Sequence, residues 1–405
     1  MLVFRFFPLA LLAVCAFVGC NTRVPRHSVA FDQISFVENT PATKLDAGEI
    51  VPIDAVGAID IALLDSFLVV STEGREKLLH FYQEENYLNA GELFRLGNGP
   101  YEVTSLITLT DMSVFSENGH TVIGLYDNDH FYAVNLSASL SAGQVICDWS
   151  EEAPASLKTM RFVKRGEFLC RRWIGESRMQ RFLYSSVEER PLVVTGPLDQ
   201  SVSPGPEGMN FNILNSLLGY DVSRQRVVEA STRMNTIHIY NLDGSFRRTI
   251  CLGNRVTDIS KIEHSSFWEI PTCFVDLRTS PEGFSCLFQH RDVLAFDWEG
   301  NLLSRWALPE EVDCFALDYA AGKLYTLSYE KEEIRKYRIP QCCGRIPADN
   351  PLSHIHASQA SRGQAAYRER QHQGHLPRAW QFLQDILHQT RGRTGHRVHA
   401  AVPSS

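Results

Sequence analysis

The sequence predicts an all-β protein, a six-bladed β-propeller of four-stranded antiparallel blades. The first observation is a repeated pattern: about five strand-forming residues end in an aromatic residue, and a tight turn closed by Gly leads into a second strand. Two segments carry it clearly, TIHIYNLDGSFRRTI at 236–250 and DVLAFDWEGNLLSRW at 292–306. In both, an acidic residue (Asp243 and Glu299) precedes the Gly, a composition typical of the turn between antiparallel strands.

The second observation is the period, because looser copies of this pattern recur along the chain. The corresponding strand positions are Tyr82, Val134, Tyr184, Tyr240, Phe296 and Tyr337. They lie 52, 50, 56, 56 and 41 residues apart. A sheet of this size needs neighbours to bury its two faces, and a closed ring of six sheets supplies them. We therefore expect residues 29–340 to form the ring, with a strand from the first 60 residues closing it near Tyr337.

Further strands can be assigned in chain order from alternating or apolar runs bounded by turn residues. The clearest are SVAFDQISFVE (28–38), IDIALLDSFLVVS (59–71), TVIGLYD (121–127), EFLCRRWIG (167–175), RQRVVEAST (224–232), GFSCLFQ (283–289) and GKLYTLSYE (322–330). Residues 197–208 are rich in turn formers, so we expect a loop between blades there. Residues 212–220 could host one short turn of helix.

The first 20 residues indicate a bacterial lipoprotein signal peptide. Arg5 is followed by an apolar run of 13 residues, which is too short to cross a bilayer of ~30 Å as a helix. The run ends in FVGC, which resembles a lipobox, although Phe17 stands where Leu is usual. We expect cleavage before Cys20 and lipidation of its thiol, since several acyl chains give a stable anchor. The alternative is an ordinary secretory signal; in either case residues 21–28 form a polar linker.

The end of the chain differs in composition from the body. Residues 341–405 contain eight Arg, no Lys and three acidic residues, a net charge of +5, so the first 340 residues carry −13 of the total of −8. The segment also holds seven of the fourteen His. We expect a disordered basic tail that does not fold alone, and interpret it as a read-through or shifted reading frame. The alternatives are a genuine basic arm or one helix at residues 377–389.

The most distinctive short motif is RLGNGPYE, from Arg95 to Glu102. This RxGxGPxE segment and the ending VLAFDWEGNLLSRWALPEEVDCFALDYAAGKLYTLSYEKEEIRKYRI together resemble the TolB-like six-bladed propeller lipoproteins of Bacteroidetes-type bacteria. The likeness extends over roughly residues 31–339. It implies a lipobox, a propeller and a location in the cell envelope, and it implies no established reaction.

Four residues are candidates for ligand binding. Arg95 and Glu102 could face a ligand at the mouth of the ring, or they could hold a tight turn in which Glu102 accepts backbone N–H bonds or pairs with Arg95. Arg171 and Arg172 are adjacent in a strand, so their side chains point to opposite faces. One of them could line the central channel and bind an anion. Asp127–Asp129 could supply oxygen ligands to Ca²⁺, but a hairpin turn is favoured because no later Glu completes the ligand set.

Several classes of function are disfavoured by the sequence. The negative body argues against nucleic-acid binding. No GxSxG, HExxH, Walker-type or dinucleotide motif is present, so we identify no catalytic residue, metal ligand or cofactor. The ten Cys form no CxxC or zinc-finger spacing, and we favour free thiols over disulfides.

These observations lead to two hypotheses. The first is a binding or scaffolding module, anchored by lipid in the cell envelope on the periplasmic or outer-surface face, whose partner is a protein or a glycan. The second is a metal-dependent hydrolase or lyase acting on sugars or lactones. An enzyme would need three or more Asp, Glu, Asn or His side chains to converge at the axis of the ring.

Overall fold

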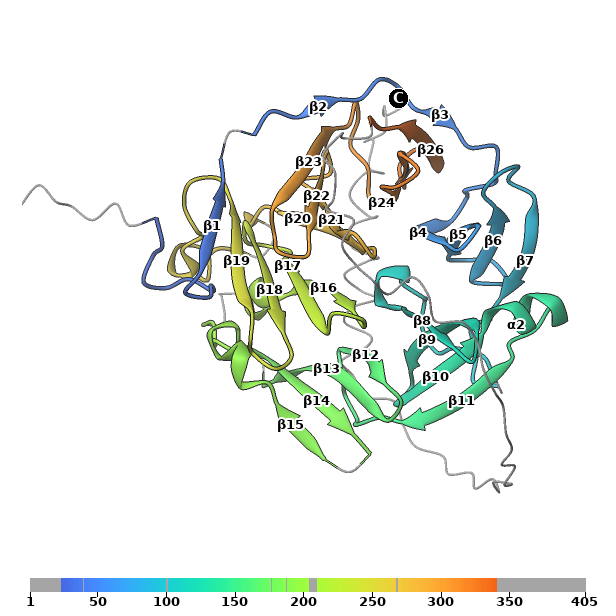
Figure 1. The fold of residues 1–405 in the computed structure, drawn as a ribbon, viewed down its shortest axis with the longest axis horizontal. Helices are drawn as coiled ribbons and strands as arrows, with labels where there is room; N and C mark the ends of the chain where they lie inside the picture. The colour runs from blue at the N-terminus through green and yellow to red at the C-terminus, as the bar shows by residue number, and fades with distance from the viewer. Residues whose placement is uncertain are drawn as a thin grey trace, which may run out of the picture. The chain divides into compact units, whose positions relative to one another are not determined.

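The computed structural model describes residues 23–340, apart from 39, 100, 176, 187, 204–209 and 267–268. Within this range six sheets surround one axis, and Figure 1 shows the chain passing from one sheet to the next around it. The predicted six-bladed propeller is therefore confirmed. The predicted signal peptide, the lipidation site Cys20 and the basic tail lie outside the described residues.

The blades follow one another in chain order, and the strands of each are given from the axis outward. Blade 1 contains β4 (Ala58–Leu64), β5 (Phe67–Thr72), β6 (Leu79–Gln83) and β7 (Asn89–Leu93). Blade 2 contains β8 (Ser113–Glu117), β9 (His120–Asp127), β10 (His130–Asn135) and β11 (Cys147–Glu152). Blade 3 contains β12 (Thr159–Lys164), β13 (Glu167–Ile174), β14 (Arg178–Ser185) and β15 (Glu189–Pro191).

The second half of the ring repeats this arrangement. Blade 4 contains β16 (Ser216–Asp221), β17 (Arg226–Ser231), β18 (Thr236–Asn241) and β19 (Arg247–Leu252). Blade 5 contains β20 (Phe274–Thr279), β21 (Gly283–Phe288), β22 (Asp292–Asp297) and β23 (Leu302–Ala307). Blade 6 contains β24 (Cys314–Asp318), β25 (Lys323–Ser328) and β26 (Glu333–Arg338). All six repeat positions predicted from the sequence fall on the third strand of their blade.

A segment before blade 1 closes the ring and covers the outside of three blades. β3 (Glu49–Ile50) pairs antiparallel with β26 as the fourth strand of blade 6, so the predicted closing strand is confirmed. The sequence did not predict that β1 (Ile34–Val37) and β2 (Thr43–Lys44) would add parallel fifth strands to β19 and β23. Figure 1 shows this segment following the outer edges of blades 4, 5 and 6. It satisfies edge-strand backbone groups that would otherwise be free to pair with another chain.

The core lies between neighbouring blades, because each sheet buries its faces against the next. Between blades 2 and 3, for example, the rings of Phe115 and Phe162 stack with centroids 3.8 Å apart, and Phe131 packs against Phe168. Burying one such side chain contributes about 1.5–3 kcal/mol. The six cysteines in the described part of the chain are free thiols, as expected: Cys147, Cys170, Cys251, Cys273, Cys286 and Cys314.

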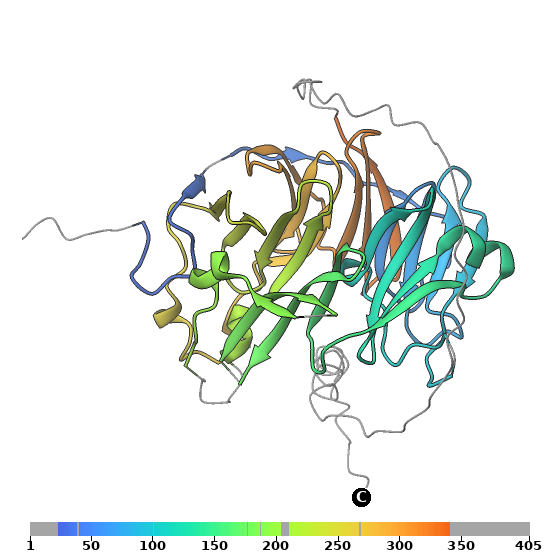
Figure 2. The ribbon, with the colours of Figure 1, turned by 60° about the horizontal axis from the view of Figure 1, so that its bottom comes forward.

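Helical segments occupy connections between strands. The helix α2 (Leu136–Ala142) was not predicted, although Asn135 caps its first turn and Gly143 ends it at φ 63°. Figure 2 shows it at the outer edge of the ring. The expected turn of helix near residue 212 is the 3-10 helix η3 (Asn210–Leu214), after which the chain enters β16. The other 3-10 helices are η1 (Leu109–Asp111), η2 (Val193–Leu198) and η4 (Ile259–Lys261). Within the described ranges, no helix is long and apolar enough to cross a membrane.

Candidate functional site

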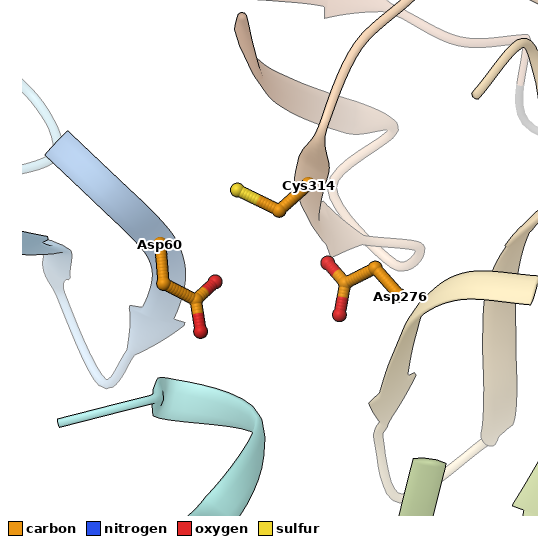
Figure 3. A group of neighbouring side chains, drawn as sticks. All are labelled: Asp60, Asp276 and Cys314. Atoms are coloured by element: carbon orange, nitrogen blue, oxygen red, sulfur yellow. The ribbon is translucent and has the colours of Figure 1, made fainter. Parts of the chain in front are cut away.

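Two aspartates and a cysteine converge at the axis of the ring. Asp60 comes from β4, Asp276 from β20 and Cys314 from β24, the innermost strands of blades 1, 5 and 6. Their oxygen and sulfur atoms lie within 4.8 Å of one another, and all three residues are buried. Figure 3 shows the three side chains pointing toward a common centre. This cluster is the part of the described structure that most resembles the axial site of the enzyme hypothesis.

The carboxylates of this cluster are, however, already saturated with protein donors. Arg278 lies between them, and its Nη2 donates to Asp276 at 2.9 Å and also contacts Asp60. Backbone N–H groups fill the remaining acceptor positions, those of Ile61, Leu109 and Thr110 for Asp60 and those of Leu277 and Phe315 for Asp276. Each carboxylate oxygen thus accepts at least two hydrogen bonds. The guanidinium group takes the place that a cation would need.

Burial raises the pKa of the Asp60 carboxyl, whereas the pKa shifts of Arg278 and Cys314 fit a structural role. Burial alone would lower the pKa of Arg278, but Asp276 and Asp60 outweigh burial and raise it. Burial, together with the same two aspartates, raises the pKa of the Cys314 thiol well above its usual value. Because a thiolate, not a thiol, is the effective metal ligand and nucleophile, Cys314 is poorly suited to either task. The cluster binds blades 1, 5 and 6 together.

A second arginine holds the loop that enters blade 2 at the same axis. Arg161 on β12 is 4% exposed and donates to the carbonyl of Leu218 at 3.1 Å. It also donates to the carbonyl oxygens of Thr110 and Met112, which flank the end of η1. Thr110 in turn donates its hydroxyl to Asp276 at 3.2 Å. Arg161 and Arg278 therefore link all six blades through η1, and most polar groups at this level of the axis are engaged by the protein itself; the buried Nε of Arg161 has no hydrogen-bond partner.

The adjacent residues Arg171 and Arg172 point to opposite faces of β13, as the sequence predicted. The side chain of Arg171 is 2% exposed and lies in the seam between blades 3 and 4 beside Glu229, where it donates to the backbone and hydroxyl oxygens of Ser216. Arg172 forms a two-pronged, half-exposed ion pair with Glu189. Both guanidinium groups thus have carboxylate partners within the chain. Anion binding by either residue stays a prediction.

The motif at Arg95–Glu102 forms a compact loop between blades 1 and 2. The Glu102 carboxylate accepts the N–H of Gly99 at 2.8 Å, and it lies so close to Gly97 that a Cβ there would be 1.9 Å from its Oε2. Arg95 pairs with Glu76 from the β5–β6 turn. This geometry matches the turn-holding alternative for Glu102. Pro100, the Pro of the motif, lies outside the described residues.

The same loop lines a pocket at the outer edge of blades 1 and 2. The pocket has a volume of about 420 Å³, and its polar lining consists of Lys77, Arg95, Tyr101, Glu102 and Gln144. Phe94, Val145 and Ile146 supply the apolar part. Val145 also packs, with Leu140 of α2, against the core between the two blades. The structure therefore brings Arg95 and Glu102 to one cavity, whereas Arg171 and Arg172 lie in another blade.

Sequence reasoning missed most of this pocket. Tyr101 lies within the motif, but Lys77 and Gln144 come from other segments that only the fold brings close. Tyr101 is 58% exposed and has φ 65°, a left-handed conformation that is unfavourable for a bulky residue. No linear pattern in the sequence signals that these segments meet or that Tyr101 is exposed with a left-handed backbone.

The acidic segment Asp127–Asp129 forms the turn between β9 and β10. Asn128 and Asp129 have φ values of 48° and 59°, which suit a tight hairpin turn. The carboxylate of Asp127 accepts the backbone N–H and the hydroxyl of Thr104, both at 2.9 Å. The favoured hairpin interpretation is confirmed, and Asp127 fixes the loop that leads from the motif to the axis.

Comparison with known proteins adds only the fold. No protein-family model and no curated protein matches the sequence. Among solved structures, the chain is similar to a candidate exported protein from Bacteroides fragilis (10% identity, TM-score 0.47, covering 76% of this chain and 100% of that one). It is also similar to BamB from Moraxella catarrhalis (9% identity, TM-score 0.36, 77% and 98%) and to Raptor from Chaetomium thermophilum (13% identity, TM-score 0.42, 70% and 28%). Similarity at this level carries no information about function.

Proposed function

We propose that the protein is a lipid-anchored propeller of the bacterial cell envelope that binds a protein or glycan at its rim. The observation that carries the binding role is the pocket between blades 1 and 2, which is lined by Arg95 and Glu102 of the distinctive motif. Rigid scaffolds commonly present their binding residues on such loops. The resemblance of this motif and of the chain's last two blades to TolB-like lipoproteins supports the envelope location.

No specific observation favours the alternative of a metal-dependent hydrolase or lyase at the axis. That function would need carboxylates free to take a metal ion or substrate. Asp60 and Asp276 instead give their oxygens to Arg278 and to backbone N–H groups. The rim is therefore the more suitable location for a ligand.

The anchor is tested by replacing the proposed acylated residue. A Cys20→Ala chain expressed in the native host should move from the membrane fraction to the soluble envelope fraction and lose incorporation of a labelled fatty acid. The wild-type chain and a Cys251→Ala chain, which removes a buried thiol of β19, should remain in the membrane fraction. A Cys20→Ala chain that stays membrane-bound and labelled would contradict the anchor.

The binding role is tested with the purified full chain immobilised in detergent. Solubilised envelope proteins and isolated envelope glycans should contain a component that the chain retains. Excess free chain should compete for it, and the heat-unfolded chain should not retain it. Failure to retain any component from either preparation would contradict a binding module.

A further inference from the structure

The pocket at the rim, which we call the blade 1–2 pocket, has a cationic wall made by two residues. Lys77 is a partly buried residue, and its ammonium group has no hydrogen-bond or ion-pair partner among the described residues. Arg95 is paired with Glu76, whose side chain is 74% exposed. An exposed pair of this kind contributes only about 0–1 kcal/mol, so a ligand anion can replace Glu76 at low cost. The wall thus offers one free cation and one exchangeable cation.

The carboxylate of Glu102 also lines the pocket and keeps its negative charge, but the loop holds it in place. Its Oε2 accepts the Gly99 N–H and is held against the backbone of Gly97. Moving it out would leave that N–H without its partner and would open the loop. Glu102 therefore lowers the positive potential of the pocket, while Lys77 and Arg95 remain the two lining cations that can pair with an anionic group of a ligand.

The lining of the pocket also contains aromatic and apolar residues. Tyr101 is one of them and is 58% exposed, although its left-handed backbone, at φ 65°, costs on the order of 1–3 kcal/mol. Phe94, the residue just before Arg95, is buried under the pocket and has the same φ. Such strain persists where the surrounding structure holds a residue for a purpose. Here it places an aromatic side chain in the same lining as Lys77 and Arg95.

We propose that the blade 1–2 pocket binds a saccharide that carries a carboxylate, namely a uronic acid residue of a glycan chain. The carboxylate would pair with Lys77 and Arg95, the apolar face of the sugar ring would lie on Tyr101, and the hydroxyl groups would bond to the amide of Gln144. The pocket volume of about 420 Å³ falls within the range of small-ligand sites, about 300–1,000 Å³. This inference rests on the proposed binding function and narrows it to one class of glycan.

The test measures binding by calorimetry, with the full chain purified in detergent. The probes are tetragalacturonate, its single-residue monosaccharide, uncharged maltotetraose and an acidic tetrapeptide. Tetragalacturonate should bind, and its affinity should fall as sodium chloride is raised because salt screens exposed charges. Maltotetraose should bind at least about tenfold more weakly, since it cannot pair with the two cations. Weak binding of the monosaccharide would still support the pocket and would identify the chain's neighbouring sugars as additional contacts.

Matched variants locate the site. Lys77→Met removes the charge and keeps most of the stem, and it should weaken tetragalacturonate binding by about tenfold. Tyr101→Asn removes the ring with a residue that tolerates left-handed backbone and should also weaken binding, whereas Tyr101→Phe should preserve it. Lys164→Met, at an exposed lysine on blade 3 that pairs with Glu167, should have no effect.

Provided that each variant keeps the thermal midpoint of the wild-type chain, three results would overturn the inference. These are no binding of tetragalacturonate, equal binding of maltotetraose, or loss of binding in Lys164→Met as large as in Lys77→Met. Binding of the acidic tetrapeptide with the same dependence on Lys77 would assign the pocket to a protein ligand instead. If envelope material is retained but tetragalacturonate is not, this inference fails and the broader binding function survives.

Discussion

Replacing Glu229 with Gln should destabilise the propeller strongly, because this carboxylate neutralises two buried arginines in the seam between blades 3 and 4. Glu229 is fully buried, and Arg181 pairs with it through two hydrogen bonds of 2.6 and 2.8 Å. Arg171 approaches its Oε2 at 3.4 Å. Ser216 and Tyr240 donate their hydroxyl groups to it at 2.6 and 2.8 Å.

The expected loss of unfolding free energy is about 3–5 kcal/mol, the typical cost of removing one partner of a buried ion pair. Gln keeps the shape of Glu but places an NH₂ group among donors and leaves two guanidinium groups short of negative charge. Arg181 retains Asp199 at 3.1 Å, whereas Arg171 keeps only hydroxyl and carbonyl acceptors. The direction of the pKa shift agrees: burial would raise the pKa of Glu229, but Arg181 outweighs burial and holds it well below its usual range.

The assay is urea unfolding followed by tryptophan fluorescence, with Glu189→Gln as the matched control. Glu189 pairs through two hydrogen bonds with Arg172, the chain neighbour of Arg171, but both side chains are partly exposed, at 37% and 28%. The control should therefore lose no more than about 1 kcal/mol. Equal losses in the two variants, or a loss below about 1 kcal/mol in Glu229→Gln, would refute the claim that burial sets the strength of these pairs.

Four further predictions concern pH, the loop, the axis and the tail. Burial lowers the pKa of His238 from 6.5 to about 4, so between pH 6.5 and pH 4 only the unfolded state takes up a proton on this residue. Urea melts should therefore show the unfolding free energy falling by on the order of 3 kcal/mol from pH 6.5 to pH 4. The fall should be smaller in His238→Gln. Gly97→Ala should lower the thermal midpoint, because its Cβ would collide with Glu102, whereas Gly196→Ala, with open space around it, should not. A chelator should leave the thermal midpoint unchanged, since Arg278 occupies the axial carboxylates; a drop would indicate a bound ion. Truncation after Pro340 should also leave the midpoint unchanged, and a large loss would show that the tail belongs to the fold.

The sequence predicted the parts of the fold that repeat. The pattern of a third strand and a Gly-closed turn is clear in blades 4 and 5 and looser in the others, and its period reveals the number of blades. The two parallel strands β1 and β2 had no such signal. Each of them has four residues or fewer and pairs with the outer strand of a blade far away in the chain. Nothing in a strand-forming run identifies its partner.

The candidate site was less predictable, because its chemistry depends on which side chains share a space. Arg171 and Arg172 are equivalent in the sequence, and only the packing of blade 4 against β13 buries one and leaves the other half-exposed. Arg278 and Arg161 carry no motif at all. Their role follows from strands of different blades meeting at one axis, which residue spacing along the chain cannot encode.

The distribution of these arginines explains why we place binding at the rim. A propeller must satisfy the polar groups that six inner strands bring to its axis, either with a ligand or with its own side chains. In this chain Arg161 and Arg278 take that task, and the carbonyl groups of η1 and the carboxylates of Asp60 and Asp276 are their partners. At the rim, by contrast, Lys77 is a cation with no partner among the described residues, and it stands beside the exposed ring of Tyr101. Polar groups that the fold has already paired have little to offer a ligand, and for this reason we place the proposed ligand beside Lys77.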